Sequence, residues 1–339
     1  MSGPRIVFLL VLLAASTGAL PQPALYEGPD REQRLLDGAR REGAKLTYYT
    51  SMAERDTQRL VAAFEAKYGI KVSTWRSGKN KVLQRVISEA RARRGEASVV
   101  LNPAPEMEAL NQERLLQPVR SPHAGQLIAA ALPEHRAWIA VRVYVFVQAY
   151  NTKLVRREEL PARFEDLLEP RWKGRLGIEG KEQEWFYTLL QAMGEESGMR
   201  FFKQLAATNG VSARLGNSLL VNLVSSGEVP FALTCYSYLV EQAKAAGAPI
   251  DYIALAPTIA YTDGIGVLKD APHPHAAALF HDFMLSEGQA LLREARHLTT
   301  RRSEESRVAR FEPVFIDPVR VLADYDRWGR LFDAAISGR

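Results

Sequence analysis

The amino-acid sequence predicts an α/β protein made of two lobes that face each other across a cleft. Strand-like and helix-like segments alternate twice along the chain, over residues 45–102 and again over residues 172–257. Polar residues follow the strands at the points where helices begin, which is where ligands bind in such units. The chain has 339 residues and is 47% hydrophobic, which is enough to build two lobes with sizeable cores.

Residues 45–72 are expected to form the first βαβ unit. Leu46–Tyr49 reads as a short strand, and Ser51 followed three residues later by Glu54 has the form of a capping box. The next apolar residues repeat at helical spacing until Gly69, where the helix is expected to end before a second strand. The residues after the first strand therefore meet the amino end of a helix.

Two further strand-to-helix junctions follow, one near residue 77 and one at residue 102. Because the carboxyl ends of parallel strands meet at one edge of a sheet, the three junctions are expected to form one rim. The residues expected to contact a ligand at this rim are Thr50, Ser51, Ser77, Gly78, Asn80 and Asn102. Each of the hydroxyl and amide residues could also serve only as a helix cap.

The second region repeats the pattern after a long β-forming run at Ala140–Tyr150. The first unit is a strand followed by a helix that begins at "QEWFYTLL". The second unit is a strand, a turn at 216–218 and a helix. The third unit begins with a strand that ends in a turn at 235–238. The residues expected to contact a ligand from this side are Trp185, Asn217, Ser218, Tyr236 and Tyr238. Core packing is the competing interpretation for the aromatic residues.

The N-terminus has the form of a secretory signal peptide. Arg5 precedes the apolar run Ile6–Ala15, which is too short for a bilayer span of about 20 residues. Small residues at Thr17 and Ala19 favour cleavage after Ala19, so residues 1–19 are expected to be removed. An uncleaved anchor is the alternative. Cys235 is the single cysteine, so the chain has neither a lipobox nor an internal disulfide.

The net charge of +5 does not indicate a nucleic-acid partner. Lysine and arginine alternate with acidic residues along the helices, and the densest basic cluster, Arg91–Arg94, comes at a helix end where cations are favoured. The histidines of "HPH" at His273–His275 are expected at the surface, because no cluster of metal-ligating residues accompanies them. The sequence therefore predicts no nucleic-acid binding and no cofactor.

Six segments in order resemble the periplasmic solute-binding proteins of bacterial ABC importers. They are "LTYYTSMAERDTQRLVAAFEAKYGIKV", "GKNKVLQRVISEARA", "PEMEALNQERLLQPVRSP", "QAYNTKLV" with "LLEPRWKGRLGIEG", "LVNLVSSGEVPFALTCYSYLVEQAKAAGAPIDYIAL" and "DGIGVLKDAPHPHAAALFHDFMLSEGQALL". Together they cover most of residues 45–300. The resemblance is to family 1 of the extracellular solute-binding proteins, in its ferric-type branch, which has the type II periplasmic-binding fold.

This resemblance implies a division of the chain into lobes. The first lobe is expected to comprise residues 20–147 and, together with the C-terminal helices, 257–339, and the second lobe residues 148–256. The crossings are expected near Val147–Asn151 and Leu255–Tyr261, and closure about such a hinge traps a ligand. The resemblance further implies a monomer in the periplasm that delivers a small-molecule solute to an ABC permease of the inner membrane, without catalysis.

The iron-binding members of that branch suggest an alternative ligand, iron(III). They use adjacent tyrosines of the second lobe, often with a histidine and a carboxylate of the first. Here Tyr236 and Tyr238 are separated by Ser237, and no histidine follows the first strand. Two phenols need a strong Lewis acid and further hard ligands to lose their protons near neutral pH, and no obvious set accompanies them.

The charge of the junctions favours an anionic solute. Helix amino ends from both lobes would converge on the cleft, and these ends attract anions. Arg76 and Lys79 lie beside one of them. Neither of the turn segments "RSGKNK" and "RLGNS" contains an acidic residue. The expected ligand is an anionic or phosphorylated organic compound. A remote alternative is an enzyme on the same fold with Cys235 as nucleophile, since a thiol at a strand-to-helix turn can have a lowered pKa.

Overall fold

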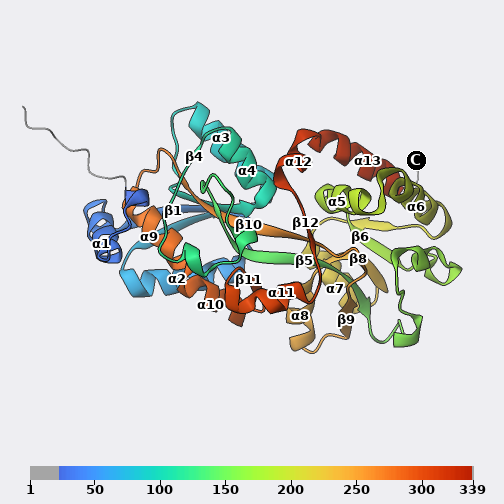
Figure 1. Cartoon of the computed structure of the whole chain (residues 1–339). Helices are drawn as coiled ribbons and strands as arrows, with labels where there is room; N and C mark the ends of the chain where they lie inside the picture. Colours follow the sequence, from blue (N-terminus) through green and yellow to red (C-terminus); the bar gives the residue numbers. More distant parts are fainter. Residues whose placement is uncertain (1–22, 338–339) are drawn as a thin grey trace, which may run out of the picture.

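The computed structural model describes residues 23–337, and the expected signal peptide at 1–19 lies outside them. One sheet runs through the molecule in the order β2-β1-β3-β10-β5-β8-β6-β7. Figure 1 shows the elongated molecule, with helices α1, α2 and α9 at one end and α5 and α6 at the other. This arrangement confirms the predicted two-lobed α/β fold.

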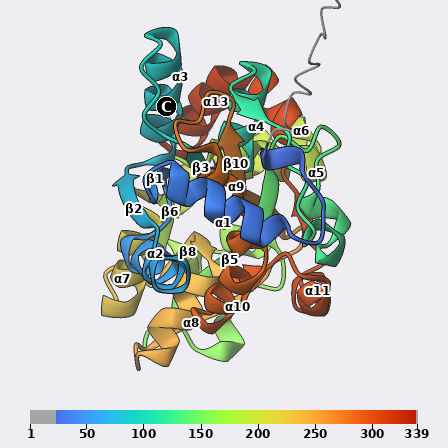
Figure 2. The ribbon, with the colours of Figure 1, turned by 90° about the vertical axis from the view of Figure 1, so that its left-hand side faces the viewer.

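Lobe 1 contains the first three strands, which are parallel to one another, as the sequence predicts. Figure 2 views this lobe end-on, with α1 lying across the front. Its strands are β1 (Lys45–Thr50), β2 (Lys71–Arg76), β3 (Val99–Pro103) and the short β4 (Leu116–Gln117). Its helices are α1 (Arg31–Arg41), α2 (Glu54–Tyr68), α3 (Lys79–Arg91), α4 (Ala104–Gln112), α9 (Pro274–Leu285) and α10 (Glu287–Glu294).

Lobe 2 contains a second set of parallel strands, β6 with β7 and with β8. Its strands are β6 (Leu176–Glu179), β7 (Ser212–Arg214), β8 (Phe231–Tyr236) and β9 (Ile250–Ile253). Its helices are α5 (Gln183–Met193), α6 (Glu195–Thr208), α7 (Asn217–Ser226) and α8 (Ser237–Ala245). An aromatic-rich core lies around β6, α5 and α6, whereas the core of lobe 1 continues into α7, β8 and α8 of this lobe.

Two long strands, β5 (Ile139–Asn151) and β10 (Ile259–Leu268), join the lobes. β5 pairs with β10 up to Val145 and with β8 from Phe146 onward, so one strand belongs to both halves of the sheet. Every residue of β5 and β10 is buried, because helices or strands cover both faces. The two strands therefore form the floor beneath the space between the lobes.

The C-terminal segment lies along both lobes (Figure 1). It contains β11 (Leu298–Thr299), α11 (Glu305–Ala309), β12 (Val314–Phe315), α12 (Pro318–Ala323) and α13 (Tyr325–Ser337). Helix α12 contacts α4 of lobe 1, whereas α13 packs against α5 and α6 of lobe 2.

The predicted capping box at Ser51 is wrong. Helix α2 begins at Glu54, its cap residue is Ala53, and no side chain caps it. The backbone N–H of Ser51 instead donates to Leu101 O at 3.3 Å, which binds the residue to the neighbouring strand. Because that bond holds the chain extended past the end of β1, the helix starts later than the sequence motif implies.

Candidate functional site

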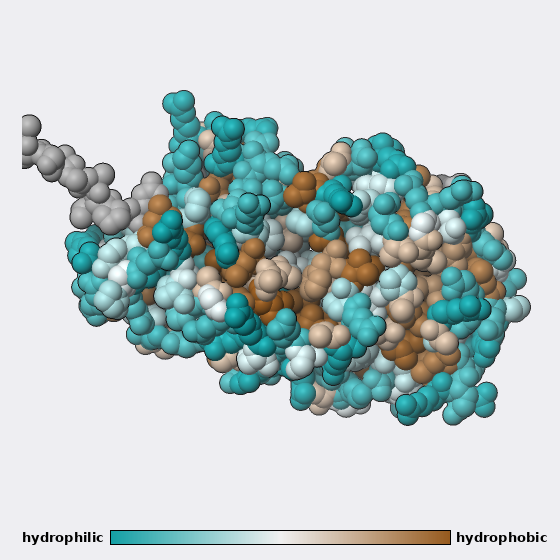
Figure 3. Space-filling view, viewed as in Figure 1, coloured by the Kyte–Doolittle hydropathy of each residue, from teal (hydrophilic) through white to brown (hydrophobic). Residues whose placement is uncertain are grey.

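A cavity of about 370 Å³ lies between the lobes, above β5 and β10. Lobe 1 contributes residues after β1, β2 and β3, and lobe 2 contributes residues after β6, β7 and β8. The lining residues are Ser51, Ala53, Arg76, Ser77, Gly78, Lys79, Pro103, Tyr144, Glu179, Lys181, Glu182, Gly216, Asn217, Ser218, Tyr236, Tyr238, Leu239, Tyr261 and Asp263. In Figure 3 the surface is indented between the two ends of the molecule, and apolar residues show along its middle. We refer to this cavity as the cleft.

The cleft brings together most of the residues that the sequence selects. Those that line it are Ser51, Ser77, Gly78, Asn217, Ser218, Tyr236 and Tyr238. Thr50 and Asn102 lie behind the rim and support it: the Thr50 hydroxyl accepts from Met52 N at 3.0 Å, and Asn102 Nδ2 donates to Lys79 O at 3.0 Å. Asn80 is exposed on helix α3, outside the lining residues.

Trp185 is placed in the core of lobe 2. Its side chain is 1% exposed and contacts the rings of Phe146, Phe164 and Phe202. It lies on the inner face of α5, so the structure places it behind the cleft and not over it.

Four tyrosines from three strands and one helix line one side of the cleft. The rings of Tyr144, Tyr236 and Tyr261 contact one another, with the Tyr144 centroid 4.7 Å from each of the other two. Tyr238 extends the group, with its ring nearly parallel to that of Tyr236. Sequence reasoning missed Tyr144 and Tyr261, although the alternation of β5 places Tyr144 on the face opposite the valines of "AVRVYVFV".

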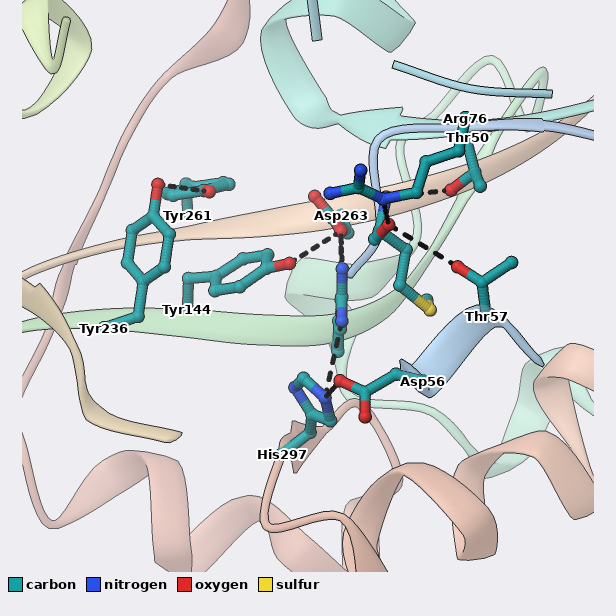
Figure 4. A network of polar contacts seen from close by, with 11 residues as sticks. Thr50, Asp56, Thr57, Arg76, Tyr144, Tyr236, Tyr261, Asp263 and His297 are labelled. Carbon is teal, nitrogen blue, oxygen red and sulfur yellow. Dashed lines mark hydrogen bonds and ion pairs between the residues drawn. The ribbon is translucent and has the colours of Figure 1, made fainter. Parts of the chain in front are cut away.

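A buried carboxylate, Glu182, lies at the end of a chain of hydrogen bonds from these tyrosines. The Tyr261 hydroxyl donates to the Tyr236 hydroxyl at 3.0 Å, which donates to Glu182 Oε1 at 2.7 Å (Figure 4 shows the tyrosine pair). Asn217 Nδ2 also donates to Glu182 Oε1 at 2.7 Å. Burial raises the pKa of Glu182 to about 7, against the opposing effect of Lys79.

A charged network lies under the cleft floor (Figure 4). Arg142 donates to Asp263 Oδ2 through two nitrogens, at 2.9 and 2.5 Å, and the Tyr144 hydroxyl donates to the same oxygen at 3.1 Å. On the other side of Arg142, His297 Nε2 lies 2.8 Å from Asp56 Oδ2, and the ring centroids of His297 and Tyr238 are 4.1 Å apart. These buried contacts hold Tyr144 and Tyr238 in place.

The cations of the cleft differ in how they are paired. Lys79 Nζ lies 2.5 Å from Glu184 and 3.8 Å from Glu106, which neutralise it. Arg76 donates to the Met52 carbonyl at 2.6 Å, and within residues 23–337 neither Arg76 nor Lys181 forms an ion pair. Two positive charges, one on each lobe, are therefore available to a ligand.

The N-cap residues of α3 and α7 line the cleft, as do those of α2, α4, α5 and α8. In α3 the first backbone hydrogen bond to the cap residue runs from Val82 N to Gly78 O, and in α7 it runs from Leu220 N to Gly216 O. The N–H groups before Val82 and Leu220 have no acceptor within their own helices. They add to the positive potential of this part of the cleft.

A metal would have to use the phenols of the cleft. Within residues 23–337 no group of three or more His, Cys, Asp or Glu residues could hold a metal ion. Burial raises the pKa of Tyr238 to about 12 and raises the pKa values of Tyr144, Tyr236 and Tyr261 well above the ordinary value, so each phenol keeps its proton near neutral pH without a metal. His275 of the "HPH" motif instead contacts Glu42 at 2.5 Å, at the start of α9.

Cys235 lies in the core and not among the residues of the cleft. Its side chain is fully buried on β8, and burial raises the pKa of its thiol. A neutral, inaccessible thiol is a poor nucleophile. The geometry gives no support to the cysteine-enzyme alternative.

Known proteins of similar fold are two-lobed periplasmic binding proteins. The fold matches iron-bound HitA of Pseudomonas aeruginosa, with a TM-score of 0.74 and 23% identity over 86% of this chain and 99% of that one. It also matches AfuA of Actinobacillus pleuropneumoniae with fructose-6-phosphate bound, with a TM-score of 0.68 and 22% identity over 87% of this chain and 98% of that one. At these identities the likeness shows the fold alone.

Sequence comparison adds the family. Iron uptake protein A1 of Synechocystis is 25% identical over an alignment of 301 residues that covers 83% of this chain and 79% of that protein. None of the helices in residues 23–337 is both long and apolar enough to cross a membrane. The family profile of the bacterial extracellular solute-binding proteins matches residues 104–307, more than half of the chain. The chain therefore belongs to the bacterial extracellular solute-binding protein family, the binding components of ABC importers.

Proposed function

We propose that this protein captures a small anionic organic solute in the periplasm and delivers it to an ABC permease of the inner membrane. The observation that carries the proposal is the pair of cations, Arg76 and Lys181, that face the cleft from opposite lobes without ion-pair partners in residues 23–337. An anion between them would be bound by both lobes at once. Such a ligand favours the closed form, because only that form offers both contacts.

The acidic residues of the cleft do not cancel this positive charge. Asp263 is neutralised by Arg142, and both oxygens of Glu179 accept backbone N–H groups, from Gly216 at 2.9 Å and Lys181 at 2.6 Å. Glu182 is partly protonated near neutral pH because burial raises its pKa to about 7. The charge that a ligand meets is therefore positive on balance.

A screen by thermal shift and titration calorimetry tests the proposal. Organic acids, phosphate esters and phosphonates are expected to stabilise the protein by mass action, whereas polyamines and neutral sugars are not. Arg76→Gln and Lys181→Gln are each expected to weaken binding of the best anion about tenfold or more. Arg94→Gln, which removes an exposed charge outside the cleft, is the control. Stabilisation by cationic or neutral compounds alone would contradict the proposal.

Iron(III) is the second candidate, favoured by the four phenols of Tyr144, Tyr236, Tyr238 and Tyr261 at one side of the cleft. Phenolate oxygens are hard ligands, and a bound trivalent ion would supply the Lewis acidity that their raised pKa values require. A tyrosinate-to-iron charge-transfer band on addition of ferric citrate, reduced by Tyr236→Phe and Tyr238→Phe, would favour this candidate. A protein that stays colourless is not this kind of iron carrier.

The domain organisation proposed with this function removes residues 1–19 and assigns residues 20–147 to lobe 1 and residues 148–256 to lobe 2. Residues 257–339 comprise the second part of lobe 1 and the C-terminal helices, of which α13 packs against lobe 2. We further propose that the protein acts as a monomer. Mass spectrometry of the exported protein would identify the mature N-terminus, and native mass spectrometry would give the subunit number and any ligand that is carried along.

A further inference from the structure

Glu182 is held in one orientation by neighbours that occupy one of its two oxygens. It is the N-cap residue of α5 and comes directly after the turn that follows β6. Its side chain is buried. Oε1 accepts from the Tyr236 hydroxyl and from Asn217 Nδ2, both at 2.7 Å. The Tyr236 hydroxyl in turn accepts from Tyr261, so its own proton is committed to Glu182. The carboxylate therefore cannot rotate without losing two hydrogen bonds.

The second oxygen, Oε2, remains open to the cleft. It receives no hydrogen bond from residues 23–337, and it is not among the polar atoms there that are sealed from solvent without a partner. Glu179, three residues earlier in the same wall, differs because both of its oxygens accept backbone N–H groups. Of Glu179 and Glu182, only Glu182 therefore has a carboxylate oxygen, Oε2, that can accept a hydrogen bond from a ligand in the cleft.

When Glu182 is ionised, a solute that carried only acceptor atoms would leave this oxygen unpaired in a site closed to water. Leaving a buried charged acceptor unsatisfied is costly, so a site of this kind discriminates against ligands that lack a matching donor. The pKa of Glu182, raised to about 7 by burial, fits a group that is poorly solvated in the free protein. The positive side of the cleft, at Arg76 and Lys181, would meanwhile hold the anion.

We propose that Glu182 is the specificity-determining acceptor of the cleft, and that the solute carries a hydroxyl or ammonium donor in addition to its anionic group. This inference rests on the proposed function, and it narrows the solute from organic anions in general to bipolar ones. Its chemical class is a phosphorylated or phosphonylated compound, or a carboxylate, with a donor group that reaches Glu182 Oε2.

Three phosphonates that differ in one terminal group test the inference: ethylphosphonate, 2-hydroxyethylphosphonate and 2-aminoethylphosphonate. Titration calorimetry of the full mature protein at pH 8 should give about 10- to 100-fold tighter binding for at least one donor-bearing compound than for ethylphosphonate. Comparison of the hydroxyl and amino compounds identifies the donor. Wild-type protein suffices for this test, so it does not depend on any variant folding.

Glu182→Gln makes the test specific to this residue. Because Tyr236 and Asn217 both donate to the Oε1 position, the amide oxygen should take that place and the NH₂ group should face the cleft. The variant should therefore lose the preference for a donor-bearing ligand or reverse it. Glu196→Gln, an exposed change on α6, is the matched control and should keep the wild-type preference.

The outcomes separate this inference from the proposed function. Equal affinity for all three compounds in wild-type protein would overturn the role of Glu182 and leave the anion proposal intact. An unchanged preference in Glu182→Gln would also overturn it. If no organic anion binds, the proposed function fails, and the inference fails with it.

Discussion

Lys79 Nζ lies 2.5 Å from Glu184 Oε1, and this ion pair joins lobe 1 to lobe 2. Lys79 is the first residue of α3, whereas Glu184 is in the first turn of α5. Tyr325 of the C-terminal helix α13 donates to the same Glu184 oxygen at 3.0 Å, and Glu106 of α4 lies 3.8 Å from Lys79. Although burial opposes it, the two carboxylates hold the pKa of Lys79 well above its ordinary value. The contact can exist only while the lobes are together.

Removing this contact should shift the protein toward an open form. Glu184→Gln keeps the shape of the side chain and removes the charge, so Lys79 retains only Glu106. Because Lys79 is about a quarter exposed, the closed form should lose about 1–3 kcal/mol of stabilisation. This is less than the 3–5 kcal/mol typical of breaking a fully buried pair. Small-angle scattering of the ligand-free variant should show a larger radius of gyration than wild type.

Glu195→Gln is the control for that prediction, because its partner Arg327 forms a half-exposed pair within lobe 2 and α13. It should leave the radius unchanged. A Glu184→Gln variant as compact as wild type would show that the pair does not set the lobe equilibrium.

Tyr236 and Tyr238 should respond differently to loss of the hydroxyl. Tyr236→Phe removes the donor to Glu182 and the acceptor for Tyr261, and should weaken solute binding about tenfold. Tyr238 takes part in neither of these two bonds, so Tyr238→Phe should leave the unfolding midpoint nearly unchanged and lower affinity only through contact with the solute. Calorimetric affinities compared with unfolding midpoints check this, and unchanged affinity in both variants would remove these residues from the ligand site.

Cys235 should be dispensable for function. The thiol is buried, and its raised pKa keeps it protonated, so it should react with a thiol reagent only after unfolding. Cys235→Ala should bind solute like wild type, at a stability cost of about 1 kcal/mol from the lost packing. Turnover of a ligand by wild-type protein that disappears in this variant would reveal the enzyme that we do not expect.

The stability of the protein should fall as the pH falls from about 6.5 to about 4, in part because of His297. Burial lowers the pKa of this imidazole to about 4, whereas in the unfolded chain it has its ordinary value near 6.5. Between these values the unfolded chain binds a proton that the folded protein excludes, so acid favours unfolding. Chemical denaturation at several pH values should show this slope.

His297→Gln should flatten that slope, because glutamine does not titrate and its amide can still donate to Asp56. In wild-type protein, part of the further loss below pH 4 should come from Asp56, whose pKa is lowered by its contact with His297 although burial opposes it. An identical pH dependence in the variant and in wild type would assign the effect to other groups.

Local patterns in the sequence were sufficient to predict most of the elements and several site residues. The expected strands near residues 46–49, 99–101 and 140–150 correspond to β1, β3 and β5. Ser77, Asn217 and Tyr236 line the cleft, because carboxyl ends of parallel strands must meet at one edge wherever the sheet lies. The capping box at Ser51 failed because a bond to a distant strand, at Leu101, overrode a local preference.

The sequence by itself determined the α/β fold class, the two lobes and the polar turns between strands and helices, since periodicity and turn residues act over short distances. Tertiary structure alone decided that Tyr144 and Tyr261 contact Tyr236 in the cleft. It also decided that Trp185 is buried in the core, and that Arg76 and Lys181 are the cleft cations without ion-pair partners in residues 23–337. Lys79 and Glu184 are 105 positions apart, and no local pattern links them. Their contact follows from how two lobes pack, which depends on the burial of the whole chain.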